Sequence, residues 1–160
     1  MKKCYLLILV LLPLWIGVLS AQNSQMNVEK VIEFYSTKNS VESVEISPQF
    51  MAMMAGQGGG DKELFSKVSG IKVISMSKES NSTKDAISAM MEQMRDAVKK
   101  DKYNQIMKVK SDGSLVEMHV KDSTLLFLVQ DDKEGVVLYI NGKVDADLIK
   151  AVMDGQITIK

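Results

Sequence analysis

Apolar side chains recur every three or four residues in several segments of the chain, a spacing that is typical of amphipathic helices. A short polar residue precedes most of these segments, as expected of a helix N-cap: Ser24 or Asn27, Ser47 and Asp61. Pro48 follows Ser47 at a first helical position, where its missing N–H costs nothing. The predicted helices run from Met26 to Lys38, from Pro48 to the glycines that follow Ala55, from Asp61 to Gly70, onward from the capping-box-like residues Ser82 to Asp85, and from about Asp145 to Met153.

Alternating or uniformly apolar runs predict strands between these helices. Leu125 to Val129 and Val136 to Ile140 are apolar on both faces, so we expect them at the centre of a sheet, with helices on one face and other elements on the opposite face. Turns of two to five residues join the strands near the C-terminus, whereas parallel crossovers need about a dozen residues, which favours an antiparallel meander. The predicted strands are Val41 to Ile46, Ile71 to Ser77, about Asn104 to Lys110, Leu115 to Lys121, Leu125 to Gln130 and Val136 to Ile140.

These elements predict an α+β fold, with a mainly antiparallel sheet that has a three- to four-stranded C-terminal meander and is packed by about four to five helices. The composition is that of a globular protein, with 46% hydrophobic and 25% charged residues. Residues 22–160 are expected to form one domain of this kind, since that length is sufficient to bury a core without disulfides.

The first 21 residues have the pattern of a signal peptide: Lys2 and Lys3, then an apolar run from Tyr5 to Leu19, then small residues. The run is shorter than the roughly 20 residues of a membrane-spanning helix, although an uncleaved N-terminal anchor remains the alternative. The sequence therefore predicts an exported chain, periplasmic or extracellular, without a stable membrane span after cleavage near Ser20 or Ala21.

Removal of this leader changes the chemistry of the chain. The single Cys and the single Trp, Cys4 and Trp15, both lie in the leader, which excludes a disulfide, a thiol nucleophile or a thiolate metal site in the exported chain. Loss of Lys2 and Lys3 leaves two fewer basic residues than the 20 acidic ones, and this slightly negative charge argues against a nucleic-acid partner.

Several short motifs follow one another along the chain: Val41 to Ser47 (V-x-x-V-x-I-S), Gly70 to Ile74, Tyr103 with Met107, Asp112-Gly113, and Val137 to Gly142. Their order resembles the domain of unknown function 4252 family, small exported proteins of Bacteroidetes-type bacteria. The resemblance extends over roughly residues 26–153 and implies export, a single domain and an unknown role, with no catalytic or binding residue to carry over. The turn Asn141-Gly142-Lys143 departs from the pattern, which has an acidic residue after the glycine.

The only histidine, His119, gives no support for catalysis. It shares a strand face with Glu117 and Lys121, a face that we expect to be solvated. No second His and no Cys exists in residues 22–160 to complete a triad or a zinc site. Phosphate-binding, calcium-loop and nucleophile-elbow motifs are also missing, so no catalytic, cofactor-binding or metal residue is nominated and no cofactor is expected.

Methionine is the most distinctive residue type, with 12 in the chain. Two clusters, at Met51 to Met54 and Met90 to Met94, resemble the thioether sites that hold Cu(I). The second cluster lies on the apolar stripe that Ile87 and Val98 continue, which predicts core packing. The first cluster precedes a glycine-rich loop, Gly56 to Gly60, and its helix is either docked on the sheet or a mobile lid for an apolar partner.

These observations predict an exported non-enzymatic domain that binds a protein or an apolar ligand in the cell envelope. Two alternatives remain: a Met-rich Cu(I)-binding periplasmic protein, and an accessory protein of an envelope-stress regulator.

Overall fold

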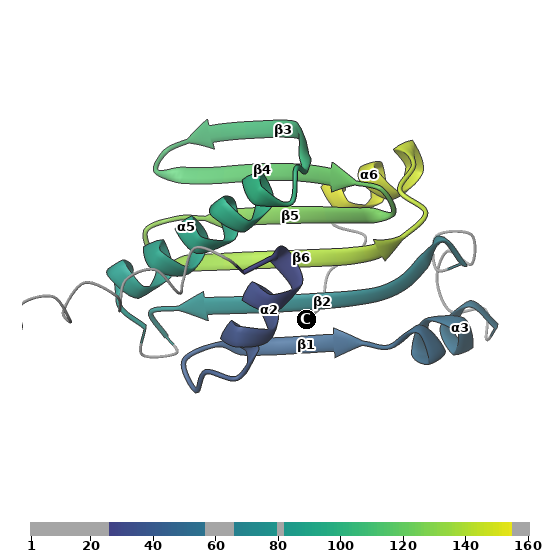
Figure 1. The fold of residues 1–160 in the computed structure, drawn as a ribbon, viewed down its shortest axis with the longest axis horizontal. Coiled ribbons are helices and arrows are strands. Elements are labelled where there is room, and N and C mark those ends of the chain that lie inside the picture. The colour runs from purple at the N-terminus through teal and green to yellow at the C-terminus, as the bar shows by residue number, and fades with distance from the viewer. Residues whose placement is uncertain (1–25, 57–65, 80–81, 155–160) are drawn as a thin grey trace, which may run out of the picture.

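A computed structural model describes residues 26–56, 66–79 and 82–154. The described residues form four helices and a six-stranded antiparallel sheet, which confirms the α+β prediction with somewhat more strands than the predicted meander (Figure 1). The predicted leader and the glycines after Gly56 lie outside the described residues. In chain order the elements are α2 (Val28–Ser36), β1 (Glu42–Ile46), α3 (Pro48–Gly56), β2 (Val68–Ser77), α5 (Lys84–Lys100), β3 (Asn104–Ser111), β4 (Ser114–Lys121), β5 (Thr124–Gln130), β6 (Glu134–Gly142) and α6 (Ala146–Met153).

The strands lie in the order β1-β2-β6-β5-β4-β3. Strands β3 to β6 form the predicted meander, and β2 pairs with the free side of β6, from Ser77 opposite Glu134 to Val68 opposite Gly142. β1 then pairs with β2 and forms one edge of the sheet, while β3 forms the other. β5 and β6 are central, as their apolar composition predicted.

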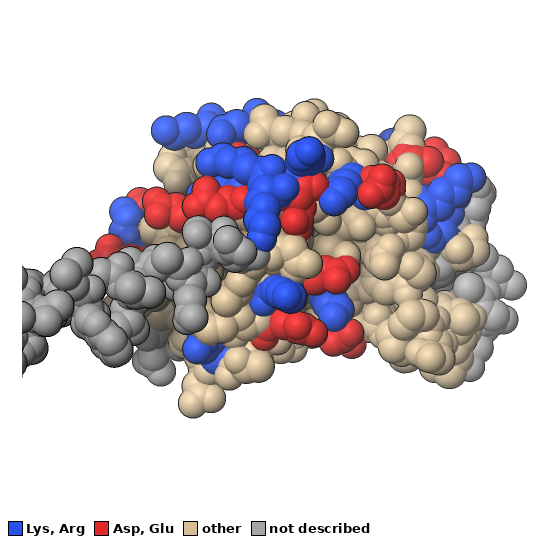
Figure 2. Space-filling view, in the orientation of Figure 1, with Lys and Arg blue, Asp and Glu red and all other residues tan. Residues whose placement is uncertain are grey.

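Helices α2 and α5 lie on one face of the sheet (Figure 1). The predicted apolar stripe of α5 is buried against β5 and β6, together with Ile74 and Met76 of β2. α5 approaches β6 closely because residue 135 is a glycine, where a Cβ would lie only 3.0 Å from Ile87 Cγ2. Charged side chains of both signs are interspersed over the outer surface of this layer (Figure 2).

The opposite face is also covered in part by helices, α6 and α3, whereas the sequence left the nature of that layer open. Leu148, Ala151 and Val152 of α6 and Met51 of α3 pack here against the sheet. β2 therefore lies between two cores, with Ile71 in one and Ile74 in the other, as predicted for a strand with two apolar faces.

Most of the described helices begin at a predicted capping residue. Asn27 Oδ1 accepts the N–H of Lys30 at 2.9 Å and thus caps α2. Ser47 Oγ accepts the N–H of Phe50 at 3.3 Å, one residue before Pro48 begins α3. Asp145 caps α6 in the same way. The N-cap of α5 is Thr83, one residue after Ser82, the first residue of the predicted capping box, whose hydroxyl donates to the carbonyl oxygen of Ser40 instead. The capping side chains accept N–H groups that have no partner within their own helix.

The predicted helix from Asp61 to Gly70 is wrong at its C-terminal end, since Val68 and Gly70 belong to β2; residues 61–65 lie outside the described residues. The prediction took Val68 as part of the helical spacing that starts at Leu64, and Gly70 as the end of that helix. In the structure both residues pair with β6, with a register shift between them, and Val68 packs in the same core as Ile71. Within the described part of the chain, no helix has both the length and the apolar character needed to cross a membrane.

Candidate functional site

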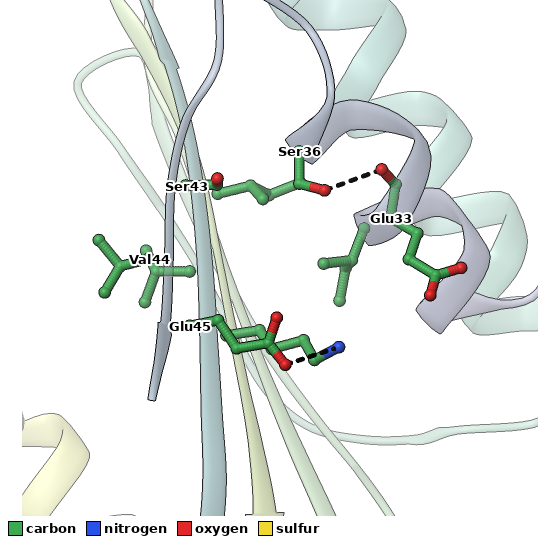
Figure 3. Close-up of a pocket in the computed structure, with 9 residues that line it drawn as sticks. Glu33, Ser36, Ser43, Val44 and Glu45 are labelled. Carbon is green, nitrogen blue, oxygen red and sulfur yellow. Dashed lines mark hydrogen bonds and ion pairs between the residues drawn. The ribbon is translucent and has the colours of Figure 1, made fainter. Parts of the chain in front are cut away.

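A groove lies between α2 and the sheet margin formed by β1 and β2. Its first part is a cavity of about 140 Å³ (Figure 3). Ser43 and Glu45 of β1 point toward α2, whereas Val44 points to the other side of the sheet, as the alternation of this strand predicted (Figure 3). The lining residues are Ile32, Glu33 and Ser36 of α2, Ser43, Val44 and Glu45 of β1, and Lys72, Val73 and Ile74 of β2.

A second cavity of about 220 Å³ adjoins the first and shares Glu45 and Lys72 with it. Glu29 of α2 and Pro48 of α3 contribute to its wall, together with Tyr139 of β6. We call the two cavities together the α2 groove. The α2 groove is bounded by α2, the sheet and the first residue of α3, so its walls come from elements that are distant in the sequence.

The charge of the α2 groove is mostly acidic. Lys72 Nζ lies 3.2 Å from Glu45 Oε1, while Glu29 and Glu33 add two further carboxylates. The Tyr139 hydroxyl donates to Glu29 Oε1 at 2.7 Å. Burial, reinforced by this hydrogen bond, raises the pKa of the Tyr139 phenol far above its ordinary value, so that it stays a donor. Such a site suits a ligand with donor or cationic groups and offers no activated nucleophile.

α3 presents an apolar surface beside this groove. No Lys, Arg, Asp or Glu occurs between Asn39 and Gly60 except Glu42 and Glu45 of β1. Met51 is buried, but the side chains of Phe50 and Met53 are 46% and 48% exposed. The helix is thus docked through Met51, as one of the two predicted alternatives stated, while it keeps two large apolar side chains in solvent.

His119 is not on a solvated face, and that prediction is wrong. The residue is only 5% exposed, and neither ring nitrogen has a hydrogen-bond partner among the described residues. Burial lowers the pKa of its imidazole, which favours the neutral form. The sequence could not show this burial, because it depends on the layer of helices that covers β4.

Glu117 is buried next to His119 on the same face and is neutralised by two cations. Arg95 Nε of α5 lies 2.6 Å from one carboxylate oxygen, and Lys108 Nζ of β3 lies 3.2 Å from the other. Burial acts to raise the pKa of Glu117, but these two hydrogen bonds outweigh it and the net shift is downward. The network links α5, β3 and β4 and is typical of a structural ion pair.

The methionines of the α5 cluster lie in the core, as predicted. Met90, Met91 and Met94 are completely buried and contribute to the core beneath α5. Their sulfur atoms pack among apolar groups, where methionine fills irregular space. Within the described residues, no three His, Cys, Asp or Glu side chains are grouped so that they could hold a metal ion.

A comparison with protein families identifies the family of this chain. Residues 35–152 match the model of a family described as "Domain of unknown function (DUF4252)". The chain belongs to this DUF4252 family. No curated protein and no solved structure matches it.

The DUF4252 match covers only part of the α2 groove. It includes all of β1, α3 and β2, and hence Glu45, Lys72 and the apolar residues of α3. Glu29 and Glu33 precede residue 35 and lie outside the match. The groove was missed by sequence reasoning because its walls are far apart in the chain, as Glu29 and Tyr139 are separated by 110 positions. A lysine within the apolar run Ile71 to Ser77 was the one local signal.

Proposed function

We propose that this DUF4252 chain is an exported, non-enzymatic binding domain of the cell envelope, and that it binds a protein partner through α3 and the adjoining α2 groove. The observation that carries the proposal is the exposure of Phe50 and Met53 on a helix without a charged residue. Large apolar side chains on a solvent-facing helix are typical of recognition surfaces, and methionine adapts to the shape of a partner.

The groove supports the same assignment. It continues from Pro48 at the start of α3 to the acidic residues of α2. A partner that covers α3 with an apolar group can therefore place an amino or guanidinium group near Glu33 and Glu45. Apolar contact supplies binding energy, and the acidic groove selects a partner with a basic residue next to its apolar anchor.

Site-specific photo-crosslinking in cells tests this proposal. A photoreactive phenylalanine analogue replaces Phe50 in the full chain, expressed with its own leader, and the crosslinked species are identified by mass spectrometry. Phe34 is the matched control, because it is an aromatic residue of similar exposure, 37%, on the outer side of α2. We expect a discrete partner from position 50 that is absent from position 34.

A second arm removes the apolar contact while the helix is kept. Phe50→Ser with Met53→Ser should abolish the crosslink from a probe at Gln49, while Phe34→Ser should leave it unchanged. Identical products from positions 34 and 50, or a product that survives the double substitution, would contradict the proposal. Mass spectrometry of the N-terminus in fractionated cells tests the export component separately.

The copper alternative has less support from the described residues. Met90, Met91 and Met94 are packed in the core, so a Cu(I) site on α5 would require the core to open. Titration of the purified chain with Cu(I) against a competing chelator decides this alternative; affinity above that of a variant with Met51 and Met53 replaced by Leu would favour it.

A further inference from the structure

The sheet has two edges whose outer sides are unpaired among the described residues. β1 forms one edge and β3 the other. The outer N–H and C=O groups of an edge strand are a template for pairing with another chain. The sheet has six strands, and each runs antiparallel to its neighbour. The first and last strands of such a sheet, β1 and β3, therefore run in opposite directions, as their arrows show in Figure 1.

The two edges carry opposite charges. β1 contains Glu42 and Glu45 and no basic residue. β3 contains Lys108 and Lys110, follows Lys102, and has no acidic residue. Figure 2 shows Lys and Arg side chains gathered along the margin that β3 occupies. Glu45 and Lys108 each have a partner within the chain, Lys72 and Glu117, but both side chains remain more than half exposed.

One register matches these edges residue by residue. β1 is five residues long, and β3 has five residues, Met107 to Ser111, beyond its bulge between Gln105 and Met107. If Val44 of one copy lies opposite Val109 of the next, antiparallel pairing sets Glu45 against Lys108 and Ser43 against Lys110. Val44 and Val109 are both exposed, at 40% and 49%.

The faces also agree in this register. Val44 points away from α2, whereas Glu45 points toward it (Figure 3). Lys108 contacts Glu117, which Arg95 of α5 also binds, so Lys108 lies on the face that α2 and α5 cover. Apolar side chains of the two copies would thus meet on one face and opposite charges on the other. A shift of one residue would lose both matches.

Pairing of like edges is disfavoured by the same residues. Two β1 strands would bring four glutamates together, and two β3 strands would bring lysines together. Like charges across a strand pair are destabilising. The charges therefore select a contact between unlike edges.

We propose that copies of this chain associate edge to edge, with β1 of one copy adding as an antiparallel strand to β3 of the next. The contact is heterologous, because it uses two different surfaces. Each pair retains one free edge of each kind, and further copies can add until the sheet twist or another element stops growth. The edge pairing does not require the partner proposed above, although the two surfaces share Glu45, which also lines the α2 groove.

Charge reversal with two complementary variants tests the proposal. The first variant carries Glu42→Lys and Ser43→Lys, and the second carries Lys110→Glu and Ser111→Glu; all four positions are exposed. Sedimentation velocity of the full chain in low salt should show wild-type mass rising with concentration, and falling at 0.5 M NaCl. Each variant alone should associate at least roughly tenfold more weakly than wild type. In the first variant, Ser43→Lys sets a lysine opposite Lys110; in the second, Ser111→Glu sets a glutamate opposite Glu42. Like charges then face each other across the strand pair.

An equimolar mixture of the two variants should recover wild-type association, since each β1 then meets a β3 of opposite charge. Wild-type protein that stays monomeric at all concentrations, variants that associate like wild type, or a mixture no stronger than its components would each overturn the proposal. Circular dichroism of both variants confirms that they are folded.

Disulfide trapping tests the register with different substitutions. In a Cys4→Ser background, Ser43→Cys and Lys110→Cys are placed in separate chains and mixed under mild oxidation. Opposed residues of antiparallel strands are close enough for a disulfide. We expect covalent dimers several-fold faster in the mixture than in either variant alone, and a ladder of oligomers from a chain with both cysteines. Equal rates in all three samples would overturn the register.

Discussion

Two methionine-rich helices of this chain have opposite placements. On α5 the methionines Met90, Met91 and Met94 are completely buried, whereas on α3 Met51 is buried and Met53 is half exposed. α5 carries charged residues such as Glu92 and Asp96 opposite its methionine stripe, which fixes the face that turns to solvent. α3 has no charged residue that would hold one of its faces in solvent. Its apolar side chains are therefore divided between core and solvent.

The comparison shows that methionine content does not by itself indicate a metal site or a binding surface. The pattern of charged residues around the methionines decides the outcome, because burial of a charge costs more than exposure of a thioether. A fully amphipathic helix contributes to the core. An apolar helix next to a groove leaves surface for a partner, which is the basis of the function proposed here.

The largest expected effect comes from truncation of a buried methionine. Met91→Ala removes a side chain that packs beside Gly135 of β6. We expect a loss of about 2–5 kcal/mol in the free energy of unfolding, through lost burial and the cavity left behind. Urea denaturation at 25 °C measures it. Met53→Ala is the matched control and should change the free energy by no more than about 0.5 kcal/mol. Equal losses in both variants would contradict the assigned placements.

A smaller change in the free energy of unfolding is expected from pH, through His119, which is buried beneath the α5 layer. Burial lowers the pKa of His119 in the folded chain, while the unfolded chain keeps a value near roughly 6.5. Below that pH the unfolded state binds a proton that the folded state resists, so stability is complete above about pH 6.5 and falls on acidification by up to about 1.4 kcal/mol per pH unit. The loss ends once pH passes the folded pKa.

His119→Leu isolates this contribution, because it removes the titrating group from a buried site. Urea denaturation between pH 7 and pH 5 should show a shallower loss of stability for the variant than for wild type. Glu117 titrates in a different window: its pKa is lowered, so its contribution is lost only below about pH 4.5. Parallel curves for wild type and His119→Leu would show that His119 does not resist protonation.

Local patterns were sufficient to predict most of the fold. The turn at Asp112-Gly113 and the short connection before Thr124 predicted the meander, since such turns join only antiparallel neighbours. The α5 stripe was predicted from its period because the helix has one apolar and one charged face. These features depend on residues close together in the chain.

Features that depend on distant residues were not predictable in this way. The burial of His119 and Glu117 depends on Arg95 of α5 and on coverage by that helix. Val68 was misassigned because its spacing from Leu64 is helical, whereas its strand conformation depends on pairing with Gly142 of β6. The α2 groove depends on Glu29 and Tyr139 meeting across the domain. In each case the deciding contact is tertiary, and the spacing of apolar residues along the chain does not indicate it.

The smallest effect expected is chemical and leaves the fold intact. Dilute hydrogen peroxide converts methionine to its sulfoxide at a rate that follows exposure of the sulfur. Met153 of α6 and Met53 of α3, at 58% and 48% exposed, should therefore be oxidised early, and Met90, Met91 and Met94 should react only as the chain unfolds. Peptide mapping by mass spectrometry over a time course measures the order. Met53→Leu should remove the early oxidation of the α3 peptide, leave that of Met153 in place and cause no loss of stability, because the Met53 side chain packs little against the core. If the α5 methionines were oxidised as fast as Met53 in folded protein, the distinction between a core helix and a surface helix would fail, and with it the argument that α3 rather than α5 meets a partner.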